Sequence, residues 1–354
     1  MLLSIITINY NNADGLRKTL SSVASQTYPH IEHIIVDGGS TDESVEVIRE
    51  YESSLASRLC GVPENARGDL GCSSPLASRL KWLSEKDTGI YNAMNKGLEI
   101  ALGRRIVNED HTSCLIASSP HRLIASDYIQ ILNSGDMLAA PDVTERMMAA
   151  LAERNEKINN QQSKQSSGNI VNIVENKKSD LLAIFYGNMI KQCPDGKKII
   201  DKCLGDRNKS KLPIREIEWT MYDFIKGTIN HDPTYIHSSL YEKYGLYDEK
   251  LKIVSDWKWF VNAVVFGGEK VFYVPIDVTI FDMTGISETN LSEREQERHN
   301  ELEKMLPLTI LKDYDTLHFP ISQYRRLKKY KIWPLVYFIE RILFKFEKWG
   351  ILNK

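Results

Sequence analysis

The hydrophobic pattern near the N-terminus alternates between the period of a strand and the period of a helix. Residues 2–9 form a nearly continuous apolar run, which predicts a buried strand. Residues 14–26 repeat apolar side chains at helical spacing, and residues 31–37 give a second buried strand. The next helix is expected to begin at a cap formed by Ser40 or Thr41. Strand, helix, strand and helix in this order predict a βαβ unit with a parallel sheet.

The remainder of the chain continues this alternation, with longer interruptions. Weak periodicity or a polar, repetitive composition marks three stretches that we interpret as insertions, near 53–80, 103–126 and 154–180. Further strands are expected at 81–83, 128–132, 181–188 and 270–283, and helices at 90–102, at 142–153 and within 252–268. The pattern of 286–354 is helical and amphipathic. We therefore expect a domain over 1–285 and a C-terminal amphipathic helical extension over 286–354.

The composition is that of an ordinary soluble globular protein. Hydrophobic residues make up 42% of the 354 residues and charged residues 26%, and the formal net charge is −2. This balance provides no global basic field, so nucleic acid is not expected as a partner. The five cysteines are few and lack the paired spacing of zinc ligands, which favours free thiols in a reducing compartment. The first residues resemble a strand more than a signal peptide, and no apolar run reaches about 18 residues, so we expect a cytoplasmic protein.

One segment departs from this charge balance, because residues 324–354 are strongly basic. Apolar residues within it share one helical face, at positions 335, 339, 342, 343 and 346. A basic helix with such a face is typical of a helix that lies on an anionic membrane surface. Packing against its own domain or against a partner protein is the alternative. A homodimer is a further arrangement that the sequence leaves open.

Polar side chains end several of the predicted strands. Asn9 and Asp37 follow the first two strands, and Asp136 follows a later one. Asp87 lies in a loop, and Asp256 begins a helix. Ligands of parallel sheets bind beyond the carboxyl ends of the strands, so we expect these side chains to line one edge. Because neighbouring carboxylates repel one another, such a cluster usually serves a cation, a set of hydroxyl groups or a proton transfer.

The sequence lacks the two common glycine-rich phosphate motifs. No G-x-G-x-x-G follows the first strand, and no G-x-x-x-x-G-K-[ST] occurs, so neither a dinucleotide dehydrogenase nor an NTPase loop is supported. Another group must therefore neutralise any phosphate bound at this edge. A divalent cation on Asp136 would do so, since Mg²⁺ and Mn²⁺ prefer oxygen ligands and are typically held by one or two carboxylates plus substrate phosphates.

Five motifs together resemble the family 2 glycosyltransferases. They occur in the family's order and read SIITINYNN, IIVDGGSTDES, SEKDTGIYNAMNKGLEIALG, YIQILNSGD and VSDWKWF. The run EKDTGIYNAMNKG is especially similar to bacterial enzymes that build surface polysaccharides. The resemblance covers roughly residues 2–285 and implies the GT-A fold, an α/β architecture with a mostly parallel central sheet flanked by helices.

The resemblance implies a nucleotide-binding role for six residues. Thr7, Asn9 and Tyr10 would border the base. Asp37 would accept hydrogen bonds from the base or the ribose, because a carboxylate suits N–H and hydroxyl donors. The remaining two are Asp87, as a second polar contact near the base, and Asn133, at the ribose or at metal-bound water.

The stretch Asn133-Ser134-Gly135-Asp136 occupies the place of the family's Asp-x-Asp motif. The usual first acids are absent, so only Asp136 is left as the direct ligand of Mg²⁺ or Mn²⁺. This departure puts coordination by two carboxylates of the motif in doubt. It leaves the site itself in place.

Asp256 matches the catalytic base of the family. An acceptor hydroxyl must lose its proton as it attacks the anomeric carbon, and a carboxylate within hydrogen-bond reach can take that proton. One base with one metal and no second carboxylate nucleophile predicts inversion at the anomeric carbon. His231 is expected near the diphosphate, the metal or the acceptor, and a purely structural role is the alternative. Trp257 is expected to contact the acceptor or to pack beside it.

These implications combine into one expected activity. The chain would transfer a sugar from a nucleotide-diphosphate donor, with UDP as the first choice and dTDP or GDP as others, to a glycan or lipid-linked acceptor. Two alternatives stay open. One is a catalytically silent protein that binds nucleotide sugars or carbohydrate on the same fold. The other is a sugar nucleotidyltransferase, although the expected glycine-rich loop with Arg or Lys is missing from NYNNADGLRK.

Overall fold

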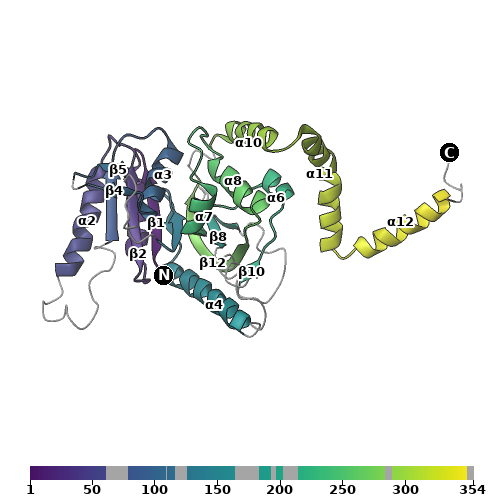
Figure 1. Ribbon diagram of the computed structural model, residues 1–354, viewed down its shortest axis with the longest axis horizontal. Coiled ribbons are helices and arrows are strands. Elements are labelled where there is room, and N and C mark those ends of the chain that lie inside the picture. The colour runs from purple at the N-terminus through teal and green to yellow at the C-terminus, as the bar shows by residue number, and fades with distance from the viewer. Residues whose placement is uncertain are drawn as a thin grey trace. The chain divides into compact units, whose positions relative to one another are not determined.

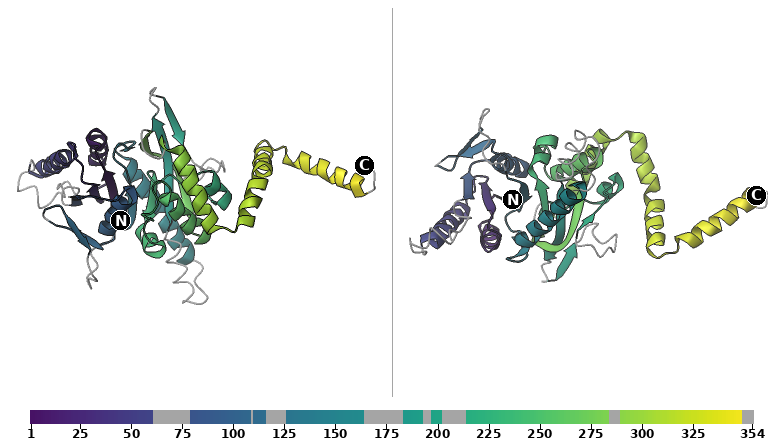
Figure 2. Two further views of the ribbon diagram at one scale, coloured as in Figure 1. Left: turned by 90° about the horizontal axis from the view of Figure 1, so that it is seen from above. Right: turned by 60° about the horizontal axis from the view of Figure 1, so that its bottom comes forward.

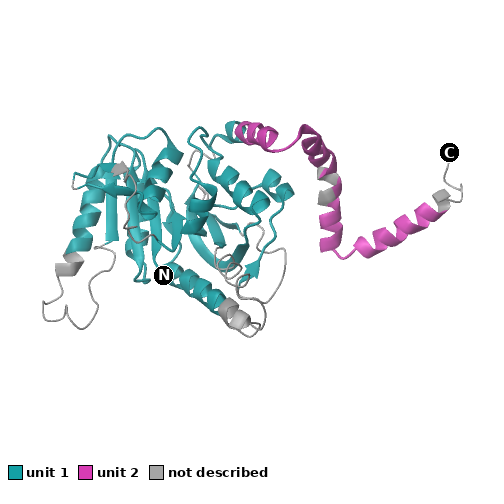
Figure 3. Ribbon diagram, in the orientation of Figure 1, with its two compact units in different colours: residues 1–294 teal, residues 295–354 magenta. Residues whose placement is uncertain are grey.

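The computed structural model describes eight stretches of the chain, at residues 1–60, 79–108, 110–115, 126–163, 183–192, 197–201, 214–283 and 289–348. The chain divides into two compact units, residues 1–294 and residues 295–354 (Figure 3). The domain boundary expected near residue 285 stays a prediction. Most of the three expected insertions lies outside the described residues.

A single mixed sheet organises the first unit (Figure 1). Within the described residues the strand order is β10-β12-β8-β11-β6-β1-β2-β3, with β7 pairing to β12 and β9 to β8. The strands β6, β1, β2 and β3 are parallel neighbours, and β11 runs antiparallel to both β6 and β8. The strands are β1 (Leu3–Asn9), β2 (Ile31–Asp37), β3 (Leu80–Ser84), β6 (Tyr128–Ile131), β7 (Met137–Leu138), β8 (Ile184–Gln192), β9 (Lys198–Asp201), β10 (Arg215–Glu216), β11 (Thr234–His237) and β12 (Val271–Asp282).

Helices flank this sheet in all three views (Figure 1, Figure 2). They are α1 (Ala13–Ala24), α2 (Ser44–Cys60), α3 (Ile90–Ala101), α4 (Val143–Ser163), α6 (Met221–Lys226), α7 (Ser238–Tyr244) and α8 (Ser255–Phe260), which continues as the π-helical turn η3 (Val261–Phe266). A separate two-stranded hairpin pairs β4 (Arg105–Val107) with β5 (Ser113–Leu115).

Alternation along β1 explains why helices pack on both of its faces. Leu3 and Ile5 belong to the core cluster that also contains Leu16 of α1. The next residue, Ile6, points the other way and meets α3, where a Cβ added to Gly97 would lie 2.4 Å from Ile6 Cγ2. All seven residues of β1 are therefore buried, and each such Leu or Ile contributes roughly 1.5–3 kcal/mol.

The loop after β2 corrects the expected helix cap. The helix α2 begins at Ser44, and its first N–H is accepted by Asp42 Oδ1 at 3.0 Å. The other oxygen of Asp42 accepts the N–H of Ala13 at 3.0 Å, so one carboxylate serves the starts of α1 and α2. Ser40 does not cap α2, because its hydroxyl oxygen accepts the N–H of Asn11 at 2.8 Å while the hydroxyl donates to Asp37.

The strands and helices expected in the first unit are found, but six further elements are not among those that the pattern predicts: β7, β9, β10, β11, α6 and α7. Three elements also reach into the expected insertions. The helix α2 runs on to Cys60 and α4 to Ser163, into two of the stretches that the sequence pattern marks as insertions. The stretch 103–126 begins with the β4–β5 hairpin. The sequence pattern did not predict these three elements within the insertions, because their polar composition there leaves little hydrophobic periodicity.

The second unit is helical in its described residues, as expected. It contains the end of α10 (Leu291–Met305), then α11 (Leu308–Lys329) and α12 (Trp333–Lys348). Lys331, with a φ of 58°, separates α11 from α12, so the basic segment is split between two helices. No described helix combines the length and the apolar character that crossing a bilayer would need.

Candidate active site

The carboxyl ends of β1, β2 and β3 bring three polar side chains together. The parallel register pairs Asn9 with Asp37 and Asp37 with Ser84. Asn9 Nδ2 donates to Asp37 Oδ1 at 2.9 Å, and Ser84 Oγ donates to Asp37 Oδ2 at 2.7 Å. The N–H and hydroxyl of Ser40 donate to the same carboxylate. A carboxylate offers about four lone-pair positions, so donors of the protein occupy all of them on this fully buried side chain.

A nucleotide contact by Asp37 therefore stays a prediction, and it would require a local rearrangement of the hydrogen bonds. Either Ser40 or Ser84 would have to give up its hydrogen bond to the carboxylate before a base or ribose could donate there. Asn9 likewise lies just beneath the surface, at 4% exposure, with its amide turned toward Asp37 and Ser40.

Tyr10, Gly38 and Asp87 form the more open part of the same edge. The Tyr10 side chain is 64% exposed. A Cβ added to Gly38 would lie 2.2 Å from Asp87 Oδ2 and 3.3 Å from Tyr10 Cδ2, so these three residues touch. Burial raises the pKa of Asp87, although the N–H of Gly89 and the charge of Lys96 act to lower it. An exposed aromatic ring beside a half-buried carboxyl group is suited to a planar, hydrogen-bonding ligand.

Thr7 faces the interior of the protein. Its Oγ1 lies 3.0 Å from His33 Nε2, and His33 Nδ1 lies 3.1 Å from the hydroxyl of Tyr51. Thr7 and His33 are both fully buried, and burial lowers the pKa of His33 to about 3. These three side chains support the strands beneath the site. Thr7 has no exposed surface in this conformation with which to border a base.

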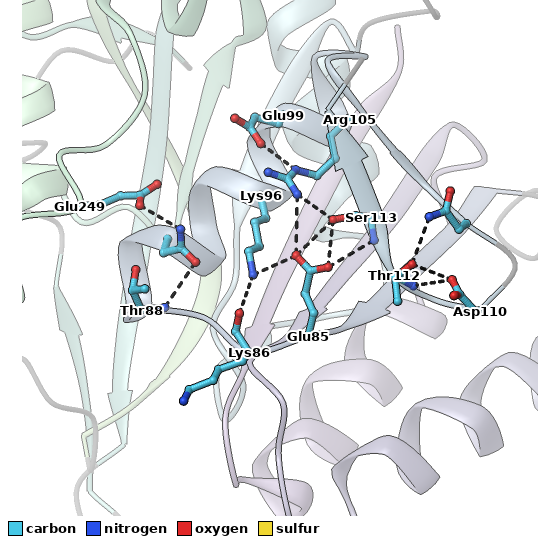
Figure 4. A network of polar contacts seen from close by, with 12 residues as sticks. Glu85, Lys86, Thr88, Lys96, Glu99, Arg105, Asp110, Thr112, Ser113 and Glu249 are labelled. Atoms are coloured by element: carbon cyan, nitrogen blue, oxygen red, sulfur yellow. Dashed lines mark hydrogen bonds and ion pairs between the residues drawn. The ribbon is translucent and has the colours of Figure 1, made fainter. Parts of the chain in front are cut away.

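The loop that carries Asp87 is anchored by a polar network (Figure 4). Lys96 Nζ lies 2.9 Å from Glu85 Oε1 and donates to the carbonyl oxygen of Lys86 at 3.0 Å. Arg105 of the β4–β5 hairpin lies 3.7 Å from the same Glu85 oxygen. The network therefore joins α3, the hairpin and the residues immediately before Asp87.

Asp136 lies in a cluster of three carboxyl groups. Its Oδ1 accepts the N–H of Asp282 at 2.8 Å, and its side chain is hydrogen-bonded to Asp232. Burial raises the pKa of Asp136 well above its ordinary value, and the neighbouring Asp232 and Asp282 raise it further. Asp136 is 3% exposed and Asp232 is 2% exposed. Their mutual repulsion is a form of strain that a cation would relieve.

This donor set is compatible with a divalent cation. Mg²⁺ and Mn²⁺ take carboxylate oxygens and complete their coordination with water and substrate phosphates. The described stretches contain no group of three or more His, Cys, Asp or Glu side chains arranged as a metal site. Metal binding at Asp136 therefore stays a prediction, with Asp232 as a second neighbouring carboxyl group.

Asp256 and His231 form an ion pair at the same edge. Asp256 Oδ2 lies 3.3 Å from His231 Nδ1, and Asp256 Oδ1 accepts the hydroxyl of Tyr91 at 2.9 Å. Burial acts to raise the pKa of Asp256, but the hydrogen bond and charge of His231 and the bond from Tyr91 lower it overall. Burial lowers the pKa of His231, but Asp232 and Asp256 outweigh burial and raise it to about 9. Near neutral pH, Asp256 is thus a carboxylate and His231 a cation.

The protonation of His231 also determines the orientation of Asn133. The Asn133 amide lies 3.1 Å from His231 Nε2, and Asn133 Oδ1 is buried without a partner when Nδ2 faces the ring. An imidazolium donates from both nitrogens. Exchanging the amide oxygen and nitrogen lets Oδ1 accept from Nε2. Asn133 then stabilises the charged form of His231.

Trp257 follows Asp256 in α8 and points into the core. It is 1% exposed, and its Nε1 donates to the carbonyl oxygen of Phe224 at 2.8 Å. From this position Trp257 fixes the helix that carries Asp256. It does not present a surface to an acceptor in this conformation.

The structure adds residues that the sequence did not single out. Asp282 ends the last strand, β12, and so repeats the strand-end carboxylate that drew attention to Asp37. Asp232 directly follows His231, and Tyr91 lies in the motif that carries Asp87. The sequence offered a local signal for Asp282, which ends a strand, and for Asp232, which lies next to His231. Tyr91 had none, because its partner Asp256 is 165 positions away.

Comparisons with known proteins indicate what the chain is similar to. Residues 4–111 match the family described as glycosyl transferase family 2. Over this stretch the chain is similar to the family 2 glycosyltransferases. It is a glycosyltransferase, and therefore an enzyme, as the sequence motifs predicted.

Several relatives of this glycosyltransferase carry names of the same kind. An uncharacterized glycosyltransferase of Mycobacterium tuberculosis is 26% identical over 266 residues, which cover 74% of this chain and 68% of that relative. A PGL/p-HBAD biosynthesis glycosyltransferase of the same species is 32% identical over 102 residues, or 29% of this chain and 32% of the relative. A Bacillus subtilis protein provisionally named for teichuronic acid biosynthesis is 33% identical over 105 residues, which cover 30% of this chain and 33% of that protein.

A solved structure shows the fold of this glycosyltransferase. TarS residues 1–349 from S. aureus, crystallised with UDP, align with a TM-score of 0.50 and 15% identity, over 92% of this chain and 74% of that one. The predicted GT-A fold is confirmed. At this identity the likeness concerns the fold alone.

Proposed function

We propose that this glycosyltransferase moves a sugar from a nucleotide-diphosphate donor to an acceptor hydroxyl, with inversion at the anomeric carbon. The observation that carries the proposal is the placement of Asp256. It is a carboxylate that keeps 13% of its side chain exposed while Tyr91 and His231 fix its two oxygens. Such a group is held ready to accept a proton and cannot swing away from the site.

The reaction assigns a role to each end of the site. The acceptor oxygen attacks the anomeric carbon and gives its proton to Asp256, while the bond from that carbon to the diphosphate oxygen breaks on the opposite side. The diphosphate leaves with the bonding electron pair. A divalent cation bound at Asp136 and Asp232 would supply positive charge to the departing diphosphate. His231 Nε2 lies 3.3 Å from Asp232 Oδ1 and His231 Nδ1 lies 3.3 Å from Asp256 Oδ2, so its charge offsets that of both carboxylates.

The open edge formed by Tyr10, Gly38 and Asp87 is proposed to bind the nucleotide. The exposed Tyr10 ring offers a stacking surface, and Asp87 offers an acceptor for an imide N–H or a ribose hydroxyl. This chemistry suits uracil or thymine, so we propose UDP first, with dTDP or GDP as alternatives. The names of the relatives support an acceptor that is a glycan or a lipid-linked glycan precursor of the cell surface.

Replacement of Asp256 tests the proposed base. The assay measures release of UDP from a panel of UDP-glucose, UDP-galactose and UDP-N-acetylglucosamine with Mn²⁺, using the donor that the native enzyme turns over fastest. Asp256→Asn should lower turnover by about 10²- to 10⁴-fold, because proton acceptance is lost. Thermal-shift titration with UDP should be unchanged.

Asp248→Asn is the matched control for this replacement. Asp248 also supports α8, through its 2.8 Å contact with Lys258, but among the hydrogen bonds and ion pairs of the described residues none joins it to Asp256. Its variant should stay within a few-fold of the native rate. Near-normal turnover in Asp256→Asn would refute the base assignment. A native chain that binds UDP but turns over none of the donors would favour the silent binding protein.

The helix α12 is proposed to place the enzyme on the cytoplasmic face of a membrane. Within this helix, Phe338, Ile342 and Leu343 are exposed apolar side chains. Arg341 and Lys345 flank them one helical turn apart and would meet anionic headgroups. Co-sedimentation with phosphatidylglycerol vesicles, weakened by salt and absent with phosphatidylcholine vesicles, is the expected result. Equal sedimentation with both vesicle types, or with neither, would reject this placement.

A further inference from the structure

The proposed base has a second partner besides His231. Tyr91 lies in the first turn of α3, directly after the loop that carries Asp87. Its hydroxyl donates to Asp256 Oδ1 at 2.9 Å, while His231 faces Asp256 Oδ2. The two carboxylate oxygens are therefore restrained from two separate parts of the chain, the loop of His231 and the helix α3. The helix α3 belongs to the half of the domain that is proposed to bind the nucleotide.

The hydroxyl of Tyr91 can only act as a donor in this contact. Tyr91 is 4% exposed. Burial raises its pKa well above the ordinary value of a tyrosine, and the charge of Asp256 raises it further. The phenol therefore stays neutral, and its one proton points to the carboxylate that accepts it.

The position of the Tyr91 hydroxyl is fixed by contacts elsewhere along α3. Asn95, one turn later, donates to the carbonyl oxygen of Tyr247 at 2.9 Å and accepts the N–H of Tyr247 at 2.9 Å. Asn95 and Asn92 also donate to the two oxygens of Glu249, each at 2.8 Å. These bonds tie α3 to the segment that leads into α8, so the two partners cannot drift apart independently.

The surroundings of Asp256 contain few other titratable groups. His231 and Tyr91 touch it, and Tyr241 and Tyr247 lie close enough to sense its charge. The hydroxyl groups of Tyr241 and Tyr247 are 3.2 Å apart and pair with each other. Tyr91 is thus the only hydroxyl of this tyrosine group with a recorded bond to the carboxylate within the described residues.

We propose that Tyr91 is a positioning residue that orients Asp256 for proton acceptance and links its orientation to the helix beginning at the donor loop. The inference rests on the proposed role of Asp256 as the base. A bond from the hydroxyl restrains rotation of the carboxylate and stabilises its ionised form. Loss of the bond should therefore disturb turnover and its pH dependence, while leaving donor binding intact.

Tyr91→Phe is the informative variant, because it removes one oxygen and keeps the ring that packs against Tyr247 at a centroid distance of 5.6 Å. Turnover of the best UDP-sugar of the panel should fall about tenfold, with the KM for the donor within about twofold. Without the hydrogen bond from the Tyr91 hydroxyl, the pKa of Asp256 rises. The base must be ionised to act, so the acidic limb of the kcat profile should move to higher pH.

Tyr247→Phe serves as the matched control. It also removes one buried hydroxyl near the site, but that hydroxyl bonds Tyr241 and not Asp256. Its turnover should stay within about twofold of the native rate. The thermal midpoints of both variants, measured without donor, show whether either loss reflects unfolding.

A double-mutant cycle separates positioning from a general structural effect. If Tyr91 acts through Asp256, adding Tyr91→Phe to Asp256→Asn should cause no further loss. Equal losses in the two backgrounds, or a matching loss in Tyr247→Phe, would overturn the inference. The inference would also be overturned if Asp256→Asn disabled the enzyme while Tyr91→Phe kept the native turnover. Near-native turnover of Asp256→Asn itself would instead overturn the proposed base, and the inference with it.

Discussion

Replacing Lys96 with methionine probes the network that anchors the donor loop. Lys96 sits in α3 with 10% of its side chain exposed, and Glu85 with 24%. The ammonium lies 2.9 Å from Glu85 Oε1 and 3.0 Å from the carbonyl oxygen of Lys86. Methionine matches the length and apolar stem of lysine but donates no hydrogen bond. The substitution therefore removes the charge and leaves the packing nearly unchanged.

The expected cost follows from the burial of the two partners. Breaking a fully buried ion pair costs about 3–5 kcal/mol, while an exposed pair is worth about 0–1 kcal/mol. This pair is largely but not completely buried, and the lost bond to Lys86 adds about 1 kcal/mol. Arg105, 3.7 Å from the same Glu85 oxygen, offsets part of the loss. We expect Lys96→Met to destabilise the protein by about 2–3 kcal/mol.

Urea unfolding followed by tryptophan fluorescence measures this change. Burial acts to raise the pKa of Glu85, but Lys96 lowers it overall. The stabilisation from Glu85 is present above the ordinary carboxyl pKa and is lost as pH falls through the lowered value. In Lys96→Met the lowering is reduced, so the variant and native curves should converge in acid.

The double variant Glu85→Gln, Lys96→Met supplies the control. Removal of both charges should recover part of the stability, because no unpaired buried carboxylate remains. Michaelis constants for the UDP-sugar should rise in Lys96→Met, since Asp87 follows the anchored residues. A loss below about 0.5 kcal/mol with an unchanged donor KM would refute the reasoning that this network positions the loop.

Two further predictions concern the neighbouring parts of the site. Gly38→Ala places a Cβ 2.2 Å from Asp87 Oδ2. The affinity for UDP in a calorimetric titration should therefore fall several-fold, and the free energy of unfolding should drop by about 1–3 kcal/mol. An unchanged affinity would contradict the proposed binding of the nucleotide base beside Gly38. In metal-free protein, His231 with a pKa of about 9 stabilises the fold fully below its ordinary value of 6.5 and loses this contribution as pH rises through about 9. Unfolding free energies should therefore fall by up to about 3 kcal/mol across that range, and His231→Gln should remove this slope.

The sequence determined the local elements and the chemistry of the strand ends. Apolar runs and helical spacing predicted the βαβ unit, because each period reports which faces of an element are buried. Asn9 and Asp37 could be expected at one edge, since parallel strands that begin together also end together. The pairing of Asn9 with Asp37 confirms that expectation. The motif order further indicated the family, which the match over residues 4–111 supports.

Only the tertiary structure decided which side chains touch. Tyr91 reaches Asp256 across 165 positions, and Asp136 receives the N–H of Asp282 across 146. No local period encodes such contacts, because they depend on how α3, α8 and β12 pack around the sheet. The same packing turned Thr7 and Trp257 inward, although their motifs suggested contact with substrate. Residue type and order specify the chemistry available to this glycosyltransferase, and packing selects the side chains whose polar atoms remain within reach of a ligand.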